Sequence, residues 1–387
     1  MRVWPAGGHK RAWFRRGALL AGIALVVVAG LVLGGVVLGS DVEGTGVEGT
    51  GVEGTGVEGT GPAGNHTTSS AAASAGSSTS AGSGSESGSQ RTGGSPHPVD
   101  PTDEVVREQF RLHATGGADI SPNFDNYASR TNVSSPLLLF LPATGYHPSE
   151  YTSFLSTARS VGYHVLALDY WNVGSSVARI CKTNAKCYGA VQRNRLDGTH
   201  PGRYSAVNPQ NSIVDRLTSA IHQLEVTDRK GGWGRFLGAG GIDWSRIVVA
   251  GHSQGGGESA YIAHVHPVRG VLMFSSPVDS DHGVDASWMH QPGATPPSRM
   301  YGFDDTGDEF VSRILPSWNA IGLGEFGRPA NTAEAPPYAS HELLSHLDLG
   351  GPKSSHLRDI TNATPRTKSG ESVFEGVWKW MLTQLYR

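Results

Sequence analysis

The sequence predicts an α/β fold: a doubly wound, mostly parallel sheet of the kind in which helices connect successive strands. Two observations favour this class. From residue 137 onward, short and nearly unbroken apolar runs recur, and such runs are typical of strands buried on both faces of a parallel sheet. Between these runs lie segments whose apolar residues repeat at helical spacing. This alternation predicts right-handed crossover connections between neighbouring strands.

Six apolar runs are the expected strands. Four are strong and two are weaker, and in chain order they are 137–141, 163–169, 246–251, 268–274, 299–302 and 342–346. Helices are expected between them, since apolar residues repeat every three or four positions there, as on the buried face of a helix. The expected helices lie around 151–158, 213–224, 258–264 and 373–382.

The N-terminal forty residues have the pattern of an export segment. Residues 1–16 are basic and are expected to stay in the cytoplasm, whereas residues 17–40 carry no charge and are rich in Leu, Val, Ala and Gly. About 20 apolar residues cross a bilayer as a helix, and positive charge before the run places the N-terminus inside. A cleaved signal peptide has a shorter apolar core, of about 7–15 residues, closed by a small-residue site. We therefore favour a signal anchor over a cleaved signal peptide. Both place the rest of the chain outside the cytoplasm, either membrane-anchored or secreted after cleavage.

Residues 41–96 are expected to be a disordered linker. The unit Val-Glu-Gly-Thr-Gly occurs four times in tandem over residues 42–61, and Ser, Gly, Ala and Thr dominate the rest. So few apolar side chains cannot offset the entropy of ordering the segment. A binding role for the repeats is the alternative. The folded catalytic domain is expected over residues 97–387.

The charge and the cysteine content argue against a nucleic-acid-binding protein and against a zinc site. The net charge is −3 and the body of the chain has no long basic run, so nothing favours a nucleic acid partner. Cys181 and Cys187 are the only cysteines, and their spacing suits a short disulfide-closed loop in an oxidising compartment. Two free thiols are the alternative. A zinc site would need two more soft ligands nearby, which the sequence lacks, so no metal is expected.

Ser253 is the predicted nucleophile. It stands in Gly251-His252-Ser253-Gln254-Gly255, between the expected strand 246–251 and the expected helix 258–264. A serine on a sharp strand-to-helix turn needs glycines beside it, since other side chains would collide there. The helix N-terminus favours a negative oxygen at this point. A serine with only a structural role in the turn is the alternative.

At these residues the chain resembles the α/β-hydrolase superfamily of serine esterases and lipases, from about residue 136 to the C-terminus. The family's order of nucleophile, acid and histidine implies that His356 is the base. This histidine follows the last expected strand, in an expected loop at 350–356. His341 and His346 are the alternatives.

The resemblance implies that the acid follows the strand at 299–302, where the chain has three aspartates. We favour Asp308, because Asp308-Glu-Phe-Val is similar to an Asp-x-x-Val stretch of the family. Asp305 is the second choice and Asp304 the third. The acidic cluster could instead bind calcium, but it lacks a full ligand loop.

The resemblance also implies two backbone donors for a negative oxygen. One is the N–H of Gln254, and the other is the N–H of Ala143 or Thr144, in the loop after the strand 137–141. Two long irregular segments are expected as lids or binding loops, at 171–211 and 279–298. We hypothesise that the loop between Cys181 and Cys187 forms part of a cap over the substrate pocket.

These features together predict an exported serine hydrolase that cleaves carboxylic esters through a Ser-His-Asp triad and an acyl-enzyme. Its substrate is expected to be a small-molecule or lipid-like ester, and no cofactor is expected. The N-terminal segment is expected to make its contact with the membrane. A peptidase or acyltransferase on the same fold is the nearest alternative. The others are a catalytically inactive hydrolase fold that serves as a surface binding module, and a stalk-like structural protein.

Overall fold

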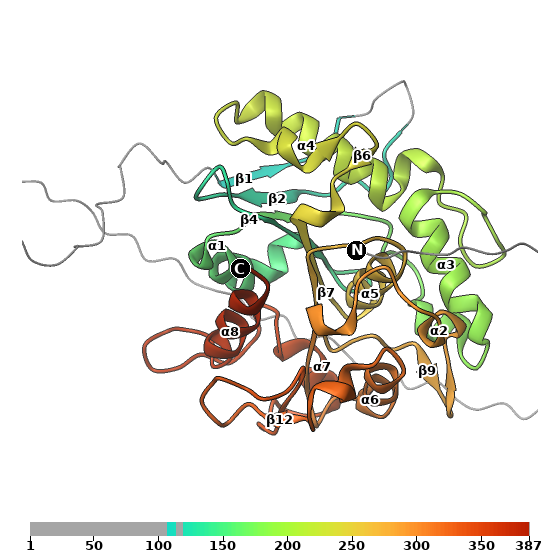
Figure 1. Ribbon diagram of the computed structural model, residues 1–387, viewed down its shortest axis with the longest axis vertical. Coiled ribbons are helices and arrows are strands. Elements are labelled where there is room, and N and C mark those ends of the chain that lie inside the picture. The colour runs from blue at the N-terminus through green and yellow to red at the C-terminus, as the bar shows by residue number, and fades with distance from the viewer. Residues whose placement is uncertain (1–106, 114–118, 387) are drawn as a thin grey trace, which may run out of the picture. The chain divides into compact units, whose positions relative to one another are not determined.

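The computed structural model describes residues 107–113 and 119–386, which carry the colours of Figure 1. The expected segments 1–16, 17–40 and 41–96 lie outside the described residues, as does the expected start of the domain at residue 97. Within the described ranges, no helix has the length and apolar character needed to cross a membrane.

One large sheet organises the described part of the chain, where nine strands have the order β1-β2-β4-β3-β7-β8-β11-β13-β12. The strands from β4 to β12 run parallel to one another, and only the β1–β2 and β2–β4 pairs are antiparallel. The predicted mostly parallel α/β sheet is confirmed. The strands are β1 (Arg107–Phe110), β2 (Asn126–Ser129), β3 (Leu137–Leu141), β4 (His164–Ala167), β7 (Ile247–His252), β8 (Gly270–Phe274), β11 (Met300–Asp305), β12 (Ala330–Asn331) and β13 (Glu342–Ser345).

Helices cover both faces of this sheet. Successive strand residues point to opposite faces, so Leu138 and Phe140 belong to one apolar core while Leu137 and Leu139 belong to the other. The first core includes α1 and α8, which pack side by side (Figure 1). The second includes α3, α4, α5 and α6. The helices are α1 (Thr152–Val161), α2 (Val177–Cys181), α3 (Ala185–Asp197), α4 (Ile213–Thr227), α5 (Gln254–Val265), α6 (Val311–Ala320), α7 (Pro352–Arg358) and α8 (Glu375–Tyr386).

The six predicted strands are all present, but β1, β2 and β12 have no apolar run and were not expected. The strand β2 is buried although it begins with a polar residue, Asn126. Its side-chain amide donates to the carbonyl of Phe110 in β1, and its side-chain oxygen accepts the N–H of Asp169 after β4. Because these partners satisfy the amide, a polar side chain can lie inside the sheet.

The prediction that 171–211 is irregular is wrong in part, because this segment contains α2 and α3. Helical periodicity is weak in α3, since its buried face includes the polar residues Gln192, Asn194 and Arg195. The predicted disulfide between Cys181 and Cys187 is present, with the two Cα atoms 5.3 Å apart, and it joins α2 to α3. The second expected irregular segment, 279–298, contains the short hairpin of β9 (Ser280–Asp281) and β10 (Val284–Asp285).

Candidate active site

Ser253 occupies a sharp turn between β7 and α5. Its backbone has φ 52° and ψ −117°, a left-handed conformation that residues other than glycine rarely adopt. Such strain persists only where the surrounding structure enforces it, and it is concentrated at functional sites. The strand-to-helix turn predicted from the sequence is therefore present, with the serine at its apex.

The glycines around Ser253 are required by close backbone contacts. A Cβ atom on Gly251 would overlap the backbone of Gly255, and a Cβ atom on Gly255 would overlap the carbonyl oxygen of Leu141. A Cβ atom on Gly256 would likewise overlap the hydroxyl of Ser276. The chain can follow this path only without side chains at the three positions. The same contacts bring the loop after β3 against the first turn of α5.

Ser253, His356 and Asp308 form a hydrogen-bonded row. The Nε2 atom of His356 lies 2.8 Å from the Oγ atom of Ser253, and its Nδ1 atom lies 2.7 Å from the Oδ2 atom of Asp308. An ionised carboxylate can only accept, so the Nδ1 atom donates to Asp308. The Nε2 atom of a neutral ring is then free to accept the proton of the serine hydroxyl.

The local structure differs from the expectation at His356. This histidine lies on the short helix α7, which begins at Pro352, and not in a loop. Asp308 follows β11 and accepts the backbone N–H of Phe310 at 2.6 Å, just before α6 begins. Both side chains are buried. The parallel strands β11 and β13 end at the same edge of the sheet as β7, so three distant segments meet beside Ser253.

The environment of Asp308 favours its ionised form. Burial alone would raise its pKa, but the hydrogen bond and charge of His356 and the N–H of Phe310 hold the pKa below its usual value. Asp308 can therefore remain an anion beside a histidine that gains a proton.

The alternative residues have other partners. Asp305 accepts the N–H of Gly307 at 2.9 Å and so closes the turn after β11. His341 contacts the carbonyl of Met300 at 2.8 Å, and His346 contacts the hydroxyl of Thr306 at 3.3 Å. Among the candidate acids and histidines, the structure brings only Asp308 and His356 to Ser253.

Two more carboxyl groups, those of Asp304 and Asp359, are buried behind the row. The sequence did not predict this position for either of them. The Oγ atom of Ser275 lies 3.0 Å from the Oδ1 atom of Asp304 and 3.0 Å from the Oδ2 atom of Asp359. Burial, and then the negative charge of Asp308, raise the pKa of both carboxyl groups well above the usual value. The Oδ2 atom of Asp304 is buried and has no hydrogen-bond partner among the described residues. A proton on this carboxyl group makes it neutral and a donor toward the ionised Asp308.

The candidate oxyanion donors are now reduced to two. The N–H of Ala143 donates to the hydroxyl of Tyr151 at 3.1 Å and is therefore occupied, so the choice of Ala143 is corrected. The backbone N–H groups of Thr144 and Gln254 have no acceptor in the described part of the chain. The Thr144 hydroxyl also donates to the Oε1 atom of Gln254 at 3.0 Å, which ties the loop after β3 to the helix.

A small cavity, of about 30 Å³, opens beside Ser253. Its walls include Val177 and Ala178 from α2, Gln192 from α3, and Phe310. The disulfide-bearing insert thus lines the space next to Ser253, as the cap hypothesis expects. The effect of this wall on catalysis stays a prediction.

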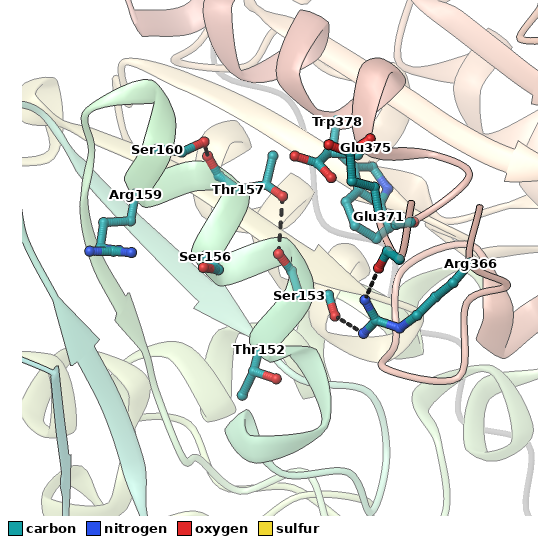
Figure 2. Close-up of a pocket in the computed structure, with 12 residues that line it drawn as sticks. Thr152, Ser153, Ser156, Thr157, Arg159, Ser160, Arg366, Glu371, Glu375 and Trp378 are labelled. Carbon is teal, nitrogen blue, oxygen red and sulfur yellow. Dashed lines mark hydrogen bonds between the residues drawn. The ribbon is translucent and has the colours of Figure 1, made fainter. Parts of the chain in front are cut away.

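A much larger cavity, of about 460 Å³, lies between α1 and the segment from Arg366 to α8 (Figure 2). Its walls carry many hydroxyl groups, and Arg366 donates to the Oγ atom of Ser153 and to the carbonyl of Gly370. None of Ser253, His356 and Asp308 lines it. The candidate site is therefore identified by the reactive side chains beside the small cavity, and not by the volume of the larger one. Among the described residues, no group of three or more His, Cys, Asp or Glu side chains could hold a metal ion.

No protein-family model and no curated protein matches the chain. Solved structures do. An S-formylglutathione hydrolase from Agrobacterium tumefaciens has 14% identity and a TM-score of 0.41, over 74% of this chain and 98% of that one. The esterase Pf2001 from Pyrococcus furiosus has 12% identity and a TM-score of 0.32, over 57% and 81% of the two chains. An acylaminoacyl peptidase from Pyrococcus horikoshii has 10% identity and a TM-score of 0.33, over 66% and 40%. Identities and TM-scores this low carry no argument about the chain. Its fold is identified by its own strand order and by the turn at Ser253.

Proposed function

We propose that this protein, which has the α/β-hydrolase fold, is a serine hydrolase that cleaves carboxylic esters. One observation carries the proposal: Ser253, His356 and Asp308 form an unbroken hydrogen-bonded row, with distances of 2.8 and 2.7 Å. The serine lies on a strained turn at the N-terminus of α5, where the helix favours negative charge.

The proposed reaction begins with attack of the Ser253 oxygen on the acyl carbon, while the Nε2 atom of His356 takes the hydroxyl proton. Asp308 remains ionised and stabilises the imidazolium that forms. The negative oxygen of the tetrahedral intermediate accepts hydrogen bonds from the free N–H groups of Thr144 and Gln254. His356 then gives its proton to the leaving alcohol, and water releases the acyl group from Ser253 by the reverse steps.

A fluorophosphonate probe tests the nucleophile, since it reacts covalently with an activated serine. We expect labelling of the folded wild type and none of Ser253→Ala. The absence of labelling in the wild type, or equal labelling of both proteins, would favour a binding module that has lost catalysis. Circular dichroism spectra of the two proteins should coincide, which separates loss of the nucleophile from loss of the fold.

A substrate panel tests the reaction class. We expect hydrolysis of 4-nitrophenyl esters with acyl chains of two to about twelve carbons, with a maximum that reports the size of the acyl pocket. Matched anilides should react far more slowly. Faster cleavage of the anilides would favour a peptidase, and transfer of the acyl group to an added alcohol in preference to water would favour an acyltransferase.

We also propose that the catalytic domain works outside the cytoplasm, tethered by the segment 17–40. The uncharged apolar run supports this location, and so does the disulfide between Cys181 and Cys187, because disulfides persist in oxidising compartments. Protease added to intact cells should remove the domain, and detergent should be needed to extract the full chain from membranes. A domain that resists protease in intact cells and is released by lysis alone would contradict the proposal.

A further inference from the structure

The cavity beside Ser253 contains two buried polar side chains from distant segments. Asp279, which follows β8, is 3% exposed, and Gln192 in α3 is 1% exposed. The Nε2 atom of Gln192 donates to the Oδ2 atom of Asp279 at 2.6 Å. Both residues line the cavity together with Ser253, so a group bound there lies within a few bond lengths of the reacting carbonyl.

The hydrogen-bonding capacity left over in this pair consists of two acceptor oxygens and the second N–H of the Gln192 amide. The Oε1 atom of Gln192 is buried and accepts no hydrogen bond from the described residues. The Oδ1 atom of Asp279 lies beside the first turn of α5, 3.5 Å from the place where a Cβ atom on Gly257 would be. A buried acceptor and a buried carboxylate are both unfavourable without a donor. A ligand that complements them must carry N–H or O–H groups.

Asp279 itself supplies the charge that favours a cation, because its carboxyl group, whose pKa burial raises to about 6, is mostly ionised above neutral pH. Glu258 in α5 contributes little charge at pH 7, because burial raises its pKa to about 8 even though Arg195 lies 3.4 Å away. Arg313 in α6 donates to the carbonyls of Ser280 and Val278 and to the hydroxyl of Tyr188 and makes no hydrogen bond to the pair, although its charge lowers the pKa of Asp279. An anionic group in the cavity would meet a carboxylate at close range, whereas an ammonium group would gain both acceptors.

We propose that Asp279 and Gln192 form a specificity pocket for a short acyl chain that ends in an ammonium group. The inference rests on the proposed ester hydrolysis at Ser253. A cavity of about 30 Å³ has room for little more than a water-sized group, so the chain between the carbonyl and the nitrogen is short. Short aminoacyl esters are the substrate class that matches this size and these acceptors.

Two isosteric substrates test the pocket. Phenyl 3-aminopropanoate and phenyl butanoate have acyl groups of equal length, and the first has an ammonium group where the second has a methyl group. Each kcat/KM is divided by the rate of spontaneous hydrolysis, which removes the intrinsic difference in reactivity. We expect the wild type to prefer the amino ester by about tenfold or more, the equivalent of one buried charge interaction. A ratio of one or below would overturn the proposal.

The variant Asp279→Asn keeps the size of the side chain and removes its charge. It should bring the ratio close to one, chiefly by lowering kcat/KM for the amino ester. Asp125→Asn is the matched control, because Asp125 is an exposed acid paired with Arg111. An unchanged preference in Asp279→Asn would overturn the proposal.

A measurement on the wild type covers the case in which Asp279→Asn does not fold. Ethylammonium chloride should inhibit butanoate hydrolysis competitively, and sodium chloride at the same ionic strength should not. Equal effects of the two salts would overturn the pocket and leave the esterase intact. Loss of both butanoate hydrolysis and fluorophosphonate labelling would instead overturn the proposed function, and the pocket with it.

Discussion

The ring of His252, the residue before Ser253, donates a hydrogen bond from its Nε2 atom to the backbone carbonyl of His356 over 2.7 Å. A carbonyl only accepts, so the proton lies on the Nε2 atom. Burial, and then the charge of His356, lower the pKa of His252 to about 3, which leaves the ring neutral. Its Nδ1 atom therefore accepts from the hydroxyl of Tyr151 at 2.9 Å, and that oxygen accepts the N–H of Ala143. One chain of hydrogen bonds thus links α7, β7 and the loop after β3.

The variant Tyr151→Phe should break this chain, because it leaves the Nδ1 atom of His252 and the N–H of Ala143 buried without partners. We expect the free energy of unfolding to fall by about 1–3 kcal/mol, measured by urea denaturation. We also expect a lower kcat, since the chain positions both His356 and the loop that carries Thr144. Tyr204→Phe is the control, because Tyr204 is exposed. Equal stability of the two variants would show that the chain contributes nothing.

The choice between the two candidate acids predicts a large difference between matched variants. Asp308→Asn should lower kcat by about 10⁴, because an amide that donates to the Nδ1 atom forces the wrong tautomer of His356. Asp305→Asn should stay within about tenfold of the wild type, since Asp305 contacts the N–H of Gly307 and not the histidine. Initial rates on a 4-nitrophenyl ester measure both. The reverse order of the two effects would assign the acid to Asp305.

The neutral carboxyl behind the triad predicts a pH dependence of stability. The pKa of Asp304 is raised in the folded state, so the unfolded chain loses this proton first, at a pH near 4. The contribution of Asp304 to stability is therefore full below that pH and falls as the pH rises toward the folded pKa. Asn cannot ionise, and it can still donate to Asp308.

Asp304→Asn should consequently gain stability relative to the wild type as the pH rises from 5 to 8. Urea denaturation of both proteins at several pH values measures the difference. The pKa of Asp308 is lowered, so its contribution is lost only at acid pH, and it is present in both proteins. Parallel stability curves for the two proteins would contradict a neutral Asp304.

The close packing at the nucleophile predicts a strong effect of one methyl group. Gly255→Ala would place a Cβ atom on the carbonyl oxygens of Leu141 and Pro142, so we expect a loss of about 2–3 kcal/mol in the free energy of unfolding, and a loss of activity. Gly376→Ala in α8 is the matched control, because a Cβ atom there meets open space. Thermal unfolding and esterase rates compare the two. A harmless Gly255→Ala would mean that the loop after β3 can move away.

The disulfide holds α2, which supplies one wall of the cavity beside Ser253. Replacement of Cys181 and Cys187 together by Ser should lower the free energy of unfolding by about 2–3 kcal/mol, as expected for a short closed loop. It should also change KM or the preferred acyl length, because Val177 and Ala178 line the cavity. Reduction of the wild type should reproduce both effects. Unchanged kinetics after loss of the bond would refute the cap hypothesis.

Local patterns in the sequence were enough to predict the six apolar strands and the turn at Ser253. Residues 137–141 and 247–252 lie in the middle of the sheet, where both faces are buried, so their apolar character is nearly continuous. The turn at Ser253 requires glycines within a few positions of it, and such a requirement is visible in a short segment. The spacing of Cys181 and Cys187 likewise reports a local contact, which the structure confirms.

Only the tertiary structure decided which distant side chains meet. It brought Asp308 rather than Asp305 to His356, occupied the N–H of Ala143 with Tyr151, and placed Asp279 beside Gln192. It also buried α3, whose polar inner face hides its periodicity. Periodicity and motif spacing describe neighbours along the chain, whereas these contacts join segments that the sheet brings to a common edge. The turn at Ser253 was therefore determined by the sequence, whereas the fold decided which acid and histidine contact Ser253, which backbone N–H groups beside it are free, and which side chains line its cavity.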